Sequence, residues 1–295
     1  LSENEKHKLL AVMAFRGSGK STILNLSYSL WSILGIQQKK CVLIISRTQD
    51  LVATHIRNIR QELENNKLLR DDLGPFKEEN EGWGALSLIL PYMNARIMGI
   101  SREQSIRGIR HGPTRPDLII CDDLEDSSSV ETADELNATY RWLKNEVMPA
   151  GDSDTKIIVL GNLLHKKSLL MQLRNQISEG VIDGIFRTYP LIDDRNKPLW
   201  PGKFQSENTI EELKSAIADQ ETWKREYMLT LPYGDSYDEP ASKKILSIFL
   251  ELIEGNRKKV GTRIYSSFLK KEGFQISAPY GQDDFEAIED LIREI

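Results

Sequence analysis

The chain has 295 residues, of which 40% are hydrophobic and 28% charged, and its net charge is −5. These values are typical of a soluble globular protein with one large domain or two smaller ones, so any contact with nucleic acid must come from a local basic surface. No apolar run approaches the roughly 18 residues that a membrane-spanning helix needs. Cys41 and Cys121 each lie in an apolar run, which favours reduced core residues and a cytosolic protein.

The first predicted unit is a strand, a tight turn and a helix. Residues 9–13 are apolar, residues 23–34 have helical spacing, and a glycine-rich stretch lies between them. The nucleotide-binding pattern of Gly, four residues, then Gly-Lys-Ser/Thr is met except that Ala14 replaces the first glycine. The predicted phosphate-binding residues are Arg16, Gly17, Ser18, Gly19, Lys20, Ser21 and Thr22. Lys20 would neutralise the β- and γ-phosphates, and Ser21 would bind Mg²⁺.

Next come a buried strand at residues 41–45 and a helix at 49–66, followed by an acidic surface loop at 71–81. Arg47, at the end of that strand, is a phosphate or DNA contact or simply a solvated side chain. Residues 86–90 and 96–100 predict two short strands. Between residues 96 and 116 lie five arginines and a single acidic residue. Among them Arg107, Arg110 and Arg115 are candidates for contacts with DNA phosphates or with a neighbouring subunit's nucleotide.

A second motif occupies residues 117–126, where an apolar run leads into acidic side chains. A buried strand of this kind delivers carboxylates to its C-terminal tip. Asp122 is the predicted Mg²⁺ ligand together with Ser21. A second acid should position and deprotonate the attacking water, and Asp123 is the first candidate because it is adjacent to the metal ligand. Glu125 is the second candidate.

The rest of the chain predicts helices at 131–147, 168–177 and 206–229 and strands at 156–160 and 184–191. Asn162 follows the strand at 156–160 and is a candidate sensor of the γ-phosphate, with a plain turn as the alternative. Three further helices are predicted at 242–253, 257–270 and 285–295, none with a recognisable site. The four histidines and two cysteines show no zinc-binding spacing.

Taken together, these motifs resemble the ATPase domain of the large terminase subunit, the DNA-packaging motor of tailed bacteriophages. The resemblance covers residues 9–234 and rests on residues 16–22, 43–48, 105–108, 115–125, 141–142, 160–162, 200–201 and 223–227. One departure is Asn162, which stands where that family usually has threonine. A second is that the upstream adenine-contacting segment of the family is not evident.

The resemblance implies an α/β fold, a three-layer P-loop NTPase sandwich with a mostly parallel sheet. Residues 1–190 would form the ATPase core, 191–234 a second subdomain or lid, and 235–295 a helical region without a recognisable nuclease. The implied activity is hydrolysis of ATP with Mg²⁺, coupled to translocation of double-stranded DNA into a procapsid in the host cytoplasm. The implied partners are DNA, a portal protein, a small terminase subunit and further copies of the chain in a ring, with no membrane.

Two other classes of function stay open from the sequence. A helicase or remodelling ATPase of the same P-loop class would normally show a second ATPase-like domain, and the residues after Gly234 are too few for one. The other class is a non-catalytic remnant of a terminase that binds nucleotide or DNA without turnover. The presence of Lys20, Ser21 and Asp122 argues against this class.

Overall fold

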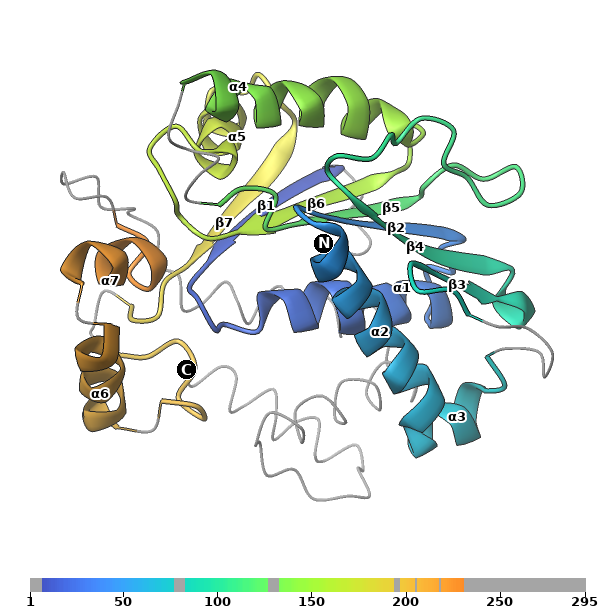
Figure 1. Cartoon of the computed structure of the whole chain (residues 1–295), viewed down its shortest axis with the longest axis horizontal. Helices are drawn as coiled ribbons and strands as arrows, with labels where there is room; N and C mark the ends of the chain where they lie inside the picture. Colours follow the sequence, from blue (N-terminus) through green and yellow to red (C-terminus); the bar gives the residue numbers. More distant parts are fainter. Residues whose placement is uncertain are drawn as a thin grey trace.

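The computed structural model describes residues 7–76, 83–126, 133–193, 197–204, 206–217 and 219–230. Its centre is a seven-stranded sheet in the order β3-β4-β2-β5-β6-β1-β7 (Figure 1). The strands are β1 (Leu9–Ala14), β2 (Cys41–Ser46), β3 (Ser87–Leu90), β4 (Ala95–Ser101), β5 (Leu118–Asp122), β6 (Lys156–Gly161) and β7 (Gly184–Tyr189). All neighbouring strands are parallel except β3 and β4, which are antiparallel.

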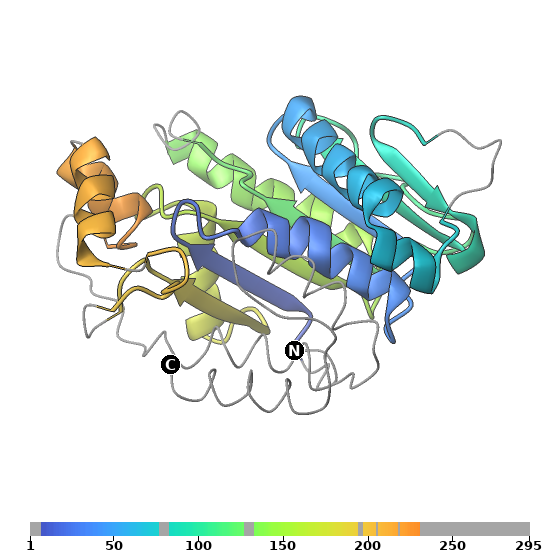
Figure 2. The ribbon, with the colours of Figure 1, turned by 90° about the horizontal axis from the view of Figure 1, so that it is seen from below.

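Helices cover both faces of the sheet, which gives three layers (Figure 2). One face carries η1 (Thr22–Tyr28), α1 (Ser29–Leu34) and α2 (Gln49–Asn65), with α3 (Lys67–Leu73) beyond them. The other face carries α4 (Ala133–Trp142), η4 (Leu143–Val147) and α5 (Leu169–Ser178). Two single 3₁₀ turns, η2 (Pro91–Met93) and η5 (Met148–Ala150), complete these layers. The predicted three-layer α/β sandwich is therefore confirmed.

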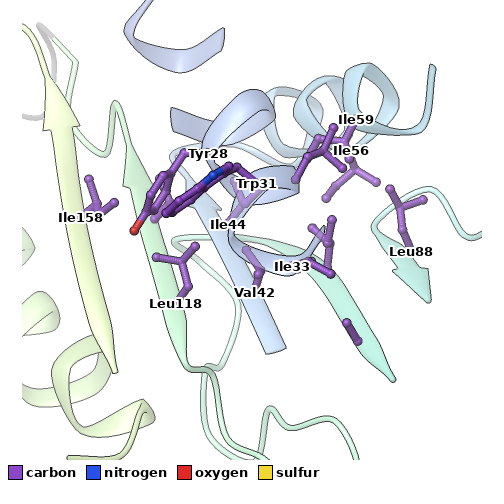
Figure 3. Close-up of a cluster of buried hydrophobic side chains, with 14 of the residues drawn as sticks. Tyr28, Trp31, Ile33, Val42, Ile44, Ile56, Ile59, Leu88, Leu118 and Ile158 are labelled. Atoms are coloured by element: carbon purple, nitrogen blue, oxygen red, sulfur yellow. The ribbon is translucent and has the colours of Figure 1, made fainter. Parts of the chain in front are cut away.

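The central strands are mostly apolar because both of their faces are buried, and the exceptions lie at strand ends, such as Ser46 of β2 and Asp122 of β5. In β1, Leu10 and Val12 pack into the core under α1 and α2, whereas Ala11 and Met13 pack into the core under α4 and α5. Figure 3 shows the first of these cores, where Tyr28 and Trp31 of the first helical segment lie against the sheet.

A third, smaller cluster joins α6 (Glu207–Ile217) and α7 (Gln220–Glu226) to the end of β1. Phe15, just after β1, packs there with Leu191, Phe204 and Trp223. The helices around this cluster are the region that the sequence assigns to a second subdomain, and Glu226 of α7 contacts Arg16 in the loop that follows β1, called the phosphate loop below (residues 15–19). The domain boundaries at 190 and 234 stay a prediction. The predicted helical region at 235–295 lies outside the described residues.

Several sequence predictions differ from the structure in detail: the predicted helix at 131–147, for example, is α4 followed by the π-helical η4. The predicted loop at 71–81 begins inside α3, which starts after Asn66, whose side chain accepts a hydrogen bond from the Leu69 N–H. The predicted single helix at 206–229 is two helices, because Asp219 caps the start of α7 by accepting from Glu221 and Thr222. The predicted helix at 23–34 begins with the π-helical segment η1. In the described ranges, no helix is both long and apolar enough to cross a bilayer.

Candidate active site

The glycine-rich stretch forms the tight loop that the sequence predicts, between β1 and the helix that begins at Lys20. Gly17 and Gly19 have φ values of 79° and 77°, a left-handed region that side chains strongly disfavour. Ala14, by contrast, is the last residue of β1 and packs into the sheet core, so the fold does not require glycine there. The loop therefore keeps its turn geometry in spite of the departure from the nucleotide-binding pattern.

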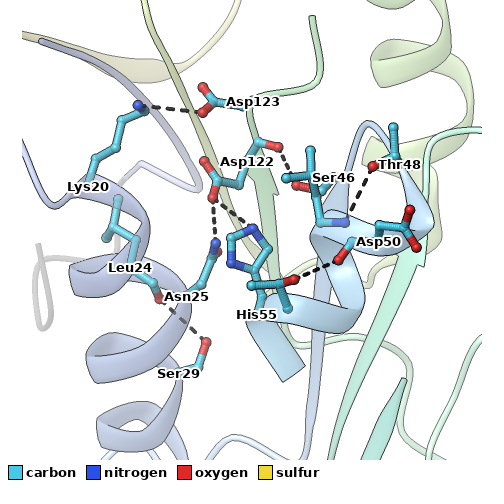
Figure 4. A network of polar contacts seen from close by, with 12 residues as sticks. Lys20, Leu24, Asn25, Ser29, Ser46, Thr48, Asp50, His55, Asp122 and Asp123 are labelled. Carbon is cyan, nitrogen blue, oxygen red and sulfur yellow. Dashed lines mark hydrogen bonds and ion pairs between the residues drawn. The ribbon is translucent and has the colours of Figure 1, made fainter. Parts of the chain in front are cut away.

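Asp122 ends β5 and is 1% exposed (Figure 4). Its Oδ2 accepts a hydrogen bond of 2.6 Å from Asn25 Nδ2 and lies 3.3 Å from His55 Nε2. Burial and the neighbouring Asp123 raise the pKa of Asp122 to about 6, whereas the nearby Ser21 hydroxyl and the charge of Lys20 lower it. The structure thus brings Ser21 and Asp122, the two predicted metal ligands, together from different elements.

This arrangement fits a magnesium ion. The Oδ1 atom of Asp122 is buried and has no hydrogen-bond partner among the residues that the structure describes. A carboxylate oxygen and a hydroxyl are hard ligands of the kind that Mg²⁺ uses when it keeps several waters and binds phosphate oxygens. No cluster of three or more Asp, Glu, His or Cys side chains that could hold a metal ion occurs in the described part of the chain. The donor set of Ser21 and Asp122 therefore suits a Mg²⁺ ion that keeps several waters.

Lys20 and Asp123 form the second half of the site. Lys20 Nζ lies 3.5 Å from Asp123 Oδ2, and the two side chains are 10% and 43% exposed. Asp123 has a φ of 46°, and its N–H donates to the carbonyl of Leu160 in β6. This local turn separates the side chains of Asp122 and Asp123 (Figure 4). One carboxylate points to Asn25 and His55, and the other points to the lysine of the phosphate loop.

Glu125 has different partners from Asp122 and Asp123. Its Oε2 accepts a hydrogen bond of 2.8 Å from the N–H of Leu169, the first residue of α5. Burial raises the pKa of Glu125 to about 7, although this hydrogen bond and the charge of Arg102 both lower it. Of the two candidates for the catalytic base, Asp123 is therefore the one paired with Lys20, whereas Glu125 contacts the start of a helix on the other face of the sheet.

Asn162 directly follows β6, the strand that separates β1 from β5. Its Oδ1 is buried and accepts no hydrogen bond from a described residue. This strand order places Asn162 between the end of β1, which leads into the phosphate loop, and the end of β5 with its two carboxylates. The position suits the predicted role as a phosphate sensor, and that role stays a prediction.

The three candidate arginines differ in their surroundings. Arg107 donates two hydrogen bonds to Glu146, at 3.0 and 2.8 Å, and Arg115 lies 3.7 Å from Asp152. Arg110 is exposed and forms no ion pair with any residue that the structure describes. Arg47 forms an ion pair with Asp126. The structure therefore does not bring these arginines into the site, and Arg110 has the least constrained guanidinium of the three candidates.

Comparisons with known proteins find a likeness in structure and none in sequence. No family model and no curated protein matches the chain. The solved large terminase of bacteriophage HK97 matches at a TM-score of 0.53 and 13% identity, over 76% of this chain and 47% of that protein. The chain has the fold of a large terminase ATPase domain. It spans about half the length of the HK97 protein, so this likeness concerns the fold and not the whole terminase.

Two further terminase structures match at lower scores. The large terminase ATPase domain of Thermus phage P74-26 matches at a TM-score of 0.46 and 13% identity, over 75% of this chain and 88% of that one. A large terminase from a thermophilic bacteriophage, solved in complex with ATP-γ-S, matches at 0.47 and 11% identity, over 76% of this chain and 47% of that one.

Within this terminase fold, the structure also places residues at the site that sequence reasoning missed. Lys203 Nζ donates to the carbonyl of Gly17 at 2.9 Å, and Arg16 pairs with Glu226 of α7 at 2.8 Å. The Trp200 ring lies 3.7 Å from where a side chain on Gly19 would begin. Residues about 200 positions away in the sequence thus contact the phosphate loop, and no local pattern signals such contacts.

Asn25 and His55 were missed as well. Asn25 is 1% exposed, a polar residue on the buried side of η1, and His55 lies in α2. Burial lowers the pKa of His55, although the charge of Asp123 counteracts this effect. An amide side chain in an apolar helical stretch five residues after Lys20 is a signal that could have pointed to Asn25. Nothing in the sequence around His55 points to Asp122.

Proposed function

We propose that this chain hydrolyses ATP at the loop and strand ends described above. The observation that carries the proposal is the meeting of two pairs of residues. Lys20 and Ser21 begin the helix that follows the glycine-rich loop, and Asp122 and Asp123 lie at the end of β5. An ammonium group, a hydroxyl and two carboxylates are the groups that phosphoryl transfer from a nucleotide requires. The substrate is ATP, and Mg²⁺ is the cofactor.

The roles of the residues follow from their positions. The backbone of residues 16–19 turns around the phosphates, and Lys20 neutralises the charge of the β- and γ-phosphates. A bound Mg²⁺ ion would supply positive charge that offsets the charge developing on the phosphate oxygens. Ser21 and Asp122 would hold it. Lys20 pairs with Asp123 at 3.5 Å in this structure. We expect a phosphate group of bound ATP to replace Asp123 as the ion-pair partner of Lys20, so that Asp123 can contact the attacking water molecule.

Asp123 then acts as the general base. One of its carboxylate oxygens accepts a proton from the water molecule that attacks the γ-phosphorus. A bond forms between the water oxygen and phosphorus, and the bond between phosphorus and the leaving oxygen of ADP breaks. Asn162, between the two halves of the site, would donate a hydrogen bond to a γ-phosphate oxygen. Glu125 has no part in this step.

We further propose that hydrolysis drives double-stranded DNA into a viral procapsid. Two observations support this: the fold shared with the HK97 large terminase and the ordered motifs over residues 9–234. The partners in this proposal are DNA, a portal protein, a small terminase subunit and other copies of the chain in a ring on the portal, in the host cytoplasm. Arg110, exposed and unpaired among the described residues, is the first candidate for a contact with DNA or with a neighbour's nucleotide.

The test is a DNA-packaging assay with purified procapsids, ATP and linear DNA, scored as DNA protected from added nuclease. The proposal predicts ATP-dependent protection by the native chain, supplied with any separately encoded nuclease, and none by Lys20→Ala. ATP hydrolysis that double-stranded DNA does not stimulate, with no protected DNA in the presence of its own procapsid, would reject packaging and leave only an ATPase.

A further inference from the structure

Asn25 is an unusual residue for its place in the fold. It lies in η1 and is 1% exposed. Its side chain faces the sheet and contacts Asp122 at the end of β5. A π-helical segment is rare, and such segments occur often at functional sites. Here the segment directly follows the phosphate loop and presents the amide of Asn25 to Asp122 (Figure 4).

His55 reaches the same carboxylate oxygen from a different helix. Its Nε2 lies 3.3 Å from Asp122 Oδ2, and its side chain is 16% exposed. Asp122 Oδ2 therefore has two nitrogen partners, one from η1 and one from α2. The backbone carbonyl of Asp122 accepts a further hydrogen bond, of 2.7 Å, from Ser46 Oγ in β2. The Asp122 carboxylate is therefore held at Oδ2 by Asn25 and His55, which are not among the predicted phosphate-binding residues.

The other polar atoms of the pair have no such partners. Asp122 Oδ1 and Asn25 Oδ1 are both buried, and neither has a hydrogen-bond partner in the described part of the chain. An asparagine with a purely structural role in a core normally uses both its amide hydrogens and its carbonyl oxygen. Two buried acceptor oxygens on a pair of hydrogen-bonded residues instead indicate a ligand that brings positive charge and hydrogen-bond donors, as a hydrated cation does.

We propose that Asn25 and His55 are positioning residues for the divalent cation of this site, a role that rests on the nucleotide site of the proposed function. They bind Oδ2 of Asp122 and so leave Oδ1 for the metal. The unpartnered Oδ1 of Asn25 would be an acceptor for a water molecule bound to that cation. Neither residue touches the nucleotide, so each acts on the affinity for the cation and not on nucleotide binding itself.

The experiment measures binding of a fluorescent, non-hydrolysable ATP analogue in EDTA and across a Mg²⁺ titration. Outer-sphere partners of metal ligands typically contribute 10- to 100-fold to metal affinity. Asn25→Leu is therefore expected to raise the half-saturating Mg²⁺ concentration by about tenfold or more, while the affinity in EDTA stays as in the native chain. Ser32→Ala is the matched control, because Ser32 is a buried polar residue of α1, the helix that directly follows η1, and it donates a hydrogen bond to the carbonyl of Ser29.

A second pair of variants covers the case in which Asn25→Leu does not fold, as judged by circular dichroism. His55→Leu should raise the half-saturating Mg²⁺ concentration in the same way. His55→Gln, which keeps an N–H donor, should bring that concentration part of the way back to the native value. The proposal is overturned if both leucine variants keep the native Mg²⁺ requirement, or if Ser32→Ala shifts it equally.

The outcome for the native chain separates this inference from the proposed function. Nucleotide binding that depends on Mg²⁺ without any hydrolysis would reject the ATPase and leave the role of Asn25 and His55 intact. Binding that is identical in Mg²⁺ and EDTA would reject the positioning role while the nucleotide site stands. An absence of nucleotide binding would reject both.

Discussion

Replacing Glu125 with glutamine should stabilise the protein at high pH and leave its chemistry in place. The pKa of Glu125 is raised from its ordinary value of 4.5 to about 7, mainly by burial. The folded chain therefore holds this proton more tightly than the unfolded chain does. The contribution of Glu125 to stability is therefore most favourable below pH 4.5. It falls as the pH rises to about 7, because the unfolded chain ionises while the folded chain still holds the proton, and above pH 7 the folded chain bears the full cost of a poorly hydrated carboxylate.

The size of the effect follows from the same shift. Each pKa unit corresponds to about 1.4 kcal/mol, so a rise of about 2.5 units costs up to about 3 kcal/mol above pH 7. Glu125→Gln removes this cost, since a neutral amide oxygen can still accept from the N–H of Leu169. We expect the variant to match the native chain near pH 4.5 and to be more stable by as much as about 3 kcal/mol at pH 8.

The assay is urea unfolding of both proteins at several pH values. Contributions from Asp122 and the histidines are common to the two proteins and cancel in the difference. A stability difference that does not change between pH 4.5 and pH 8 would refute the buried, proton-binding state of Glu125. Loss of ATP hydrolysis in a folded Glu125→Gln variant would refute its exclusion from the chemistry and make it the base instead of Asp123.

Three other experiments test separate parts of the structure. Asp123→Asn should keep nucleotide binding and lower the rate of hydrolysis by about 100-fold or more, since a general base acts in the transition state; weaker nucleotide binding with an unchanged rate would contradict this. Gly99→Ala should destabilise the chain by about 1–3 kcal/mol, because its new methyl group would lie 2.2 Å from Val52 of α2; an unchanged melting temperature would show that α2 can move away. Arg110→Ala should lower turnover of the DNA-bound assembly by about tenfold or more, whereas Arg107→Ala should have little effect because Arg107 already pairs with Glu146; the reverse order would reassign the role.

The sequence predicts those parts of the site that are local. The apolar run before residue 14, the glycines and Lys20 define a strand, a loop and a helix within about 25 residues. The apolar run before Asp122 likewise predicts carboxylates at a strand end. Each element is set by periodicity and turn chemistry, so its type could be predicted even where its bounds shift by a few residues.

The contacts between these units could not be predicted, because they depend on strand order and on helix register. His55 meets Asp122 only because β2 and β5 are neighbours and α2 follows β2. Asn25 faces the same carboxylate within a π-helical segment, and the sequence pattern gives only ordinary helical spacing there. The missed helix starts are a different matter, since Asn66 and Asp219 are capping residues that a closer reading of the sequence would have found.

The measurement that tests the central claim most directly is phosphate release from ATP in the presence of Mg²⁺, compared between the native chain and Lys20→Ala. Each protein is purified by the same route and checked for folding by circular dichroism. The account predicts hydrolysis by the native chain, lost on removal of Mg²⁺, and none above background for Lys20→Ala. Equal phosphate release by the two proteins would contradict the assignment of this loop as the site of ATP hydrolysis.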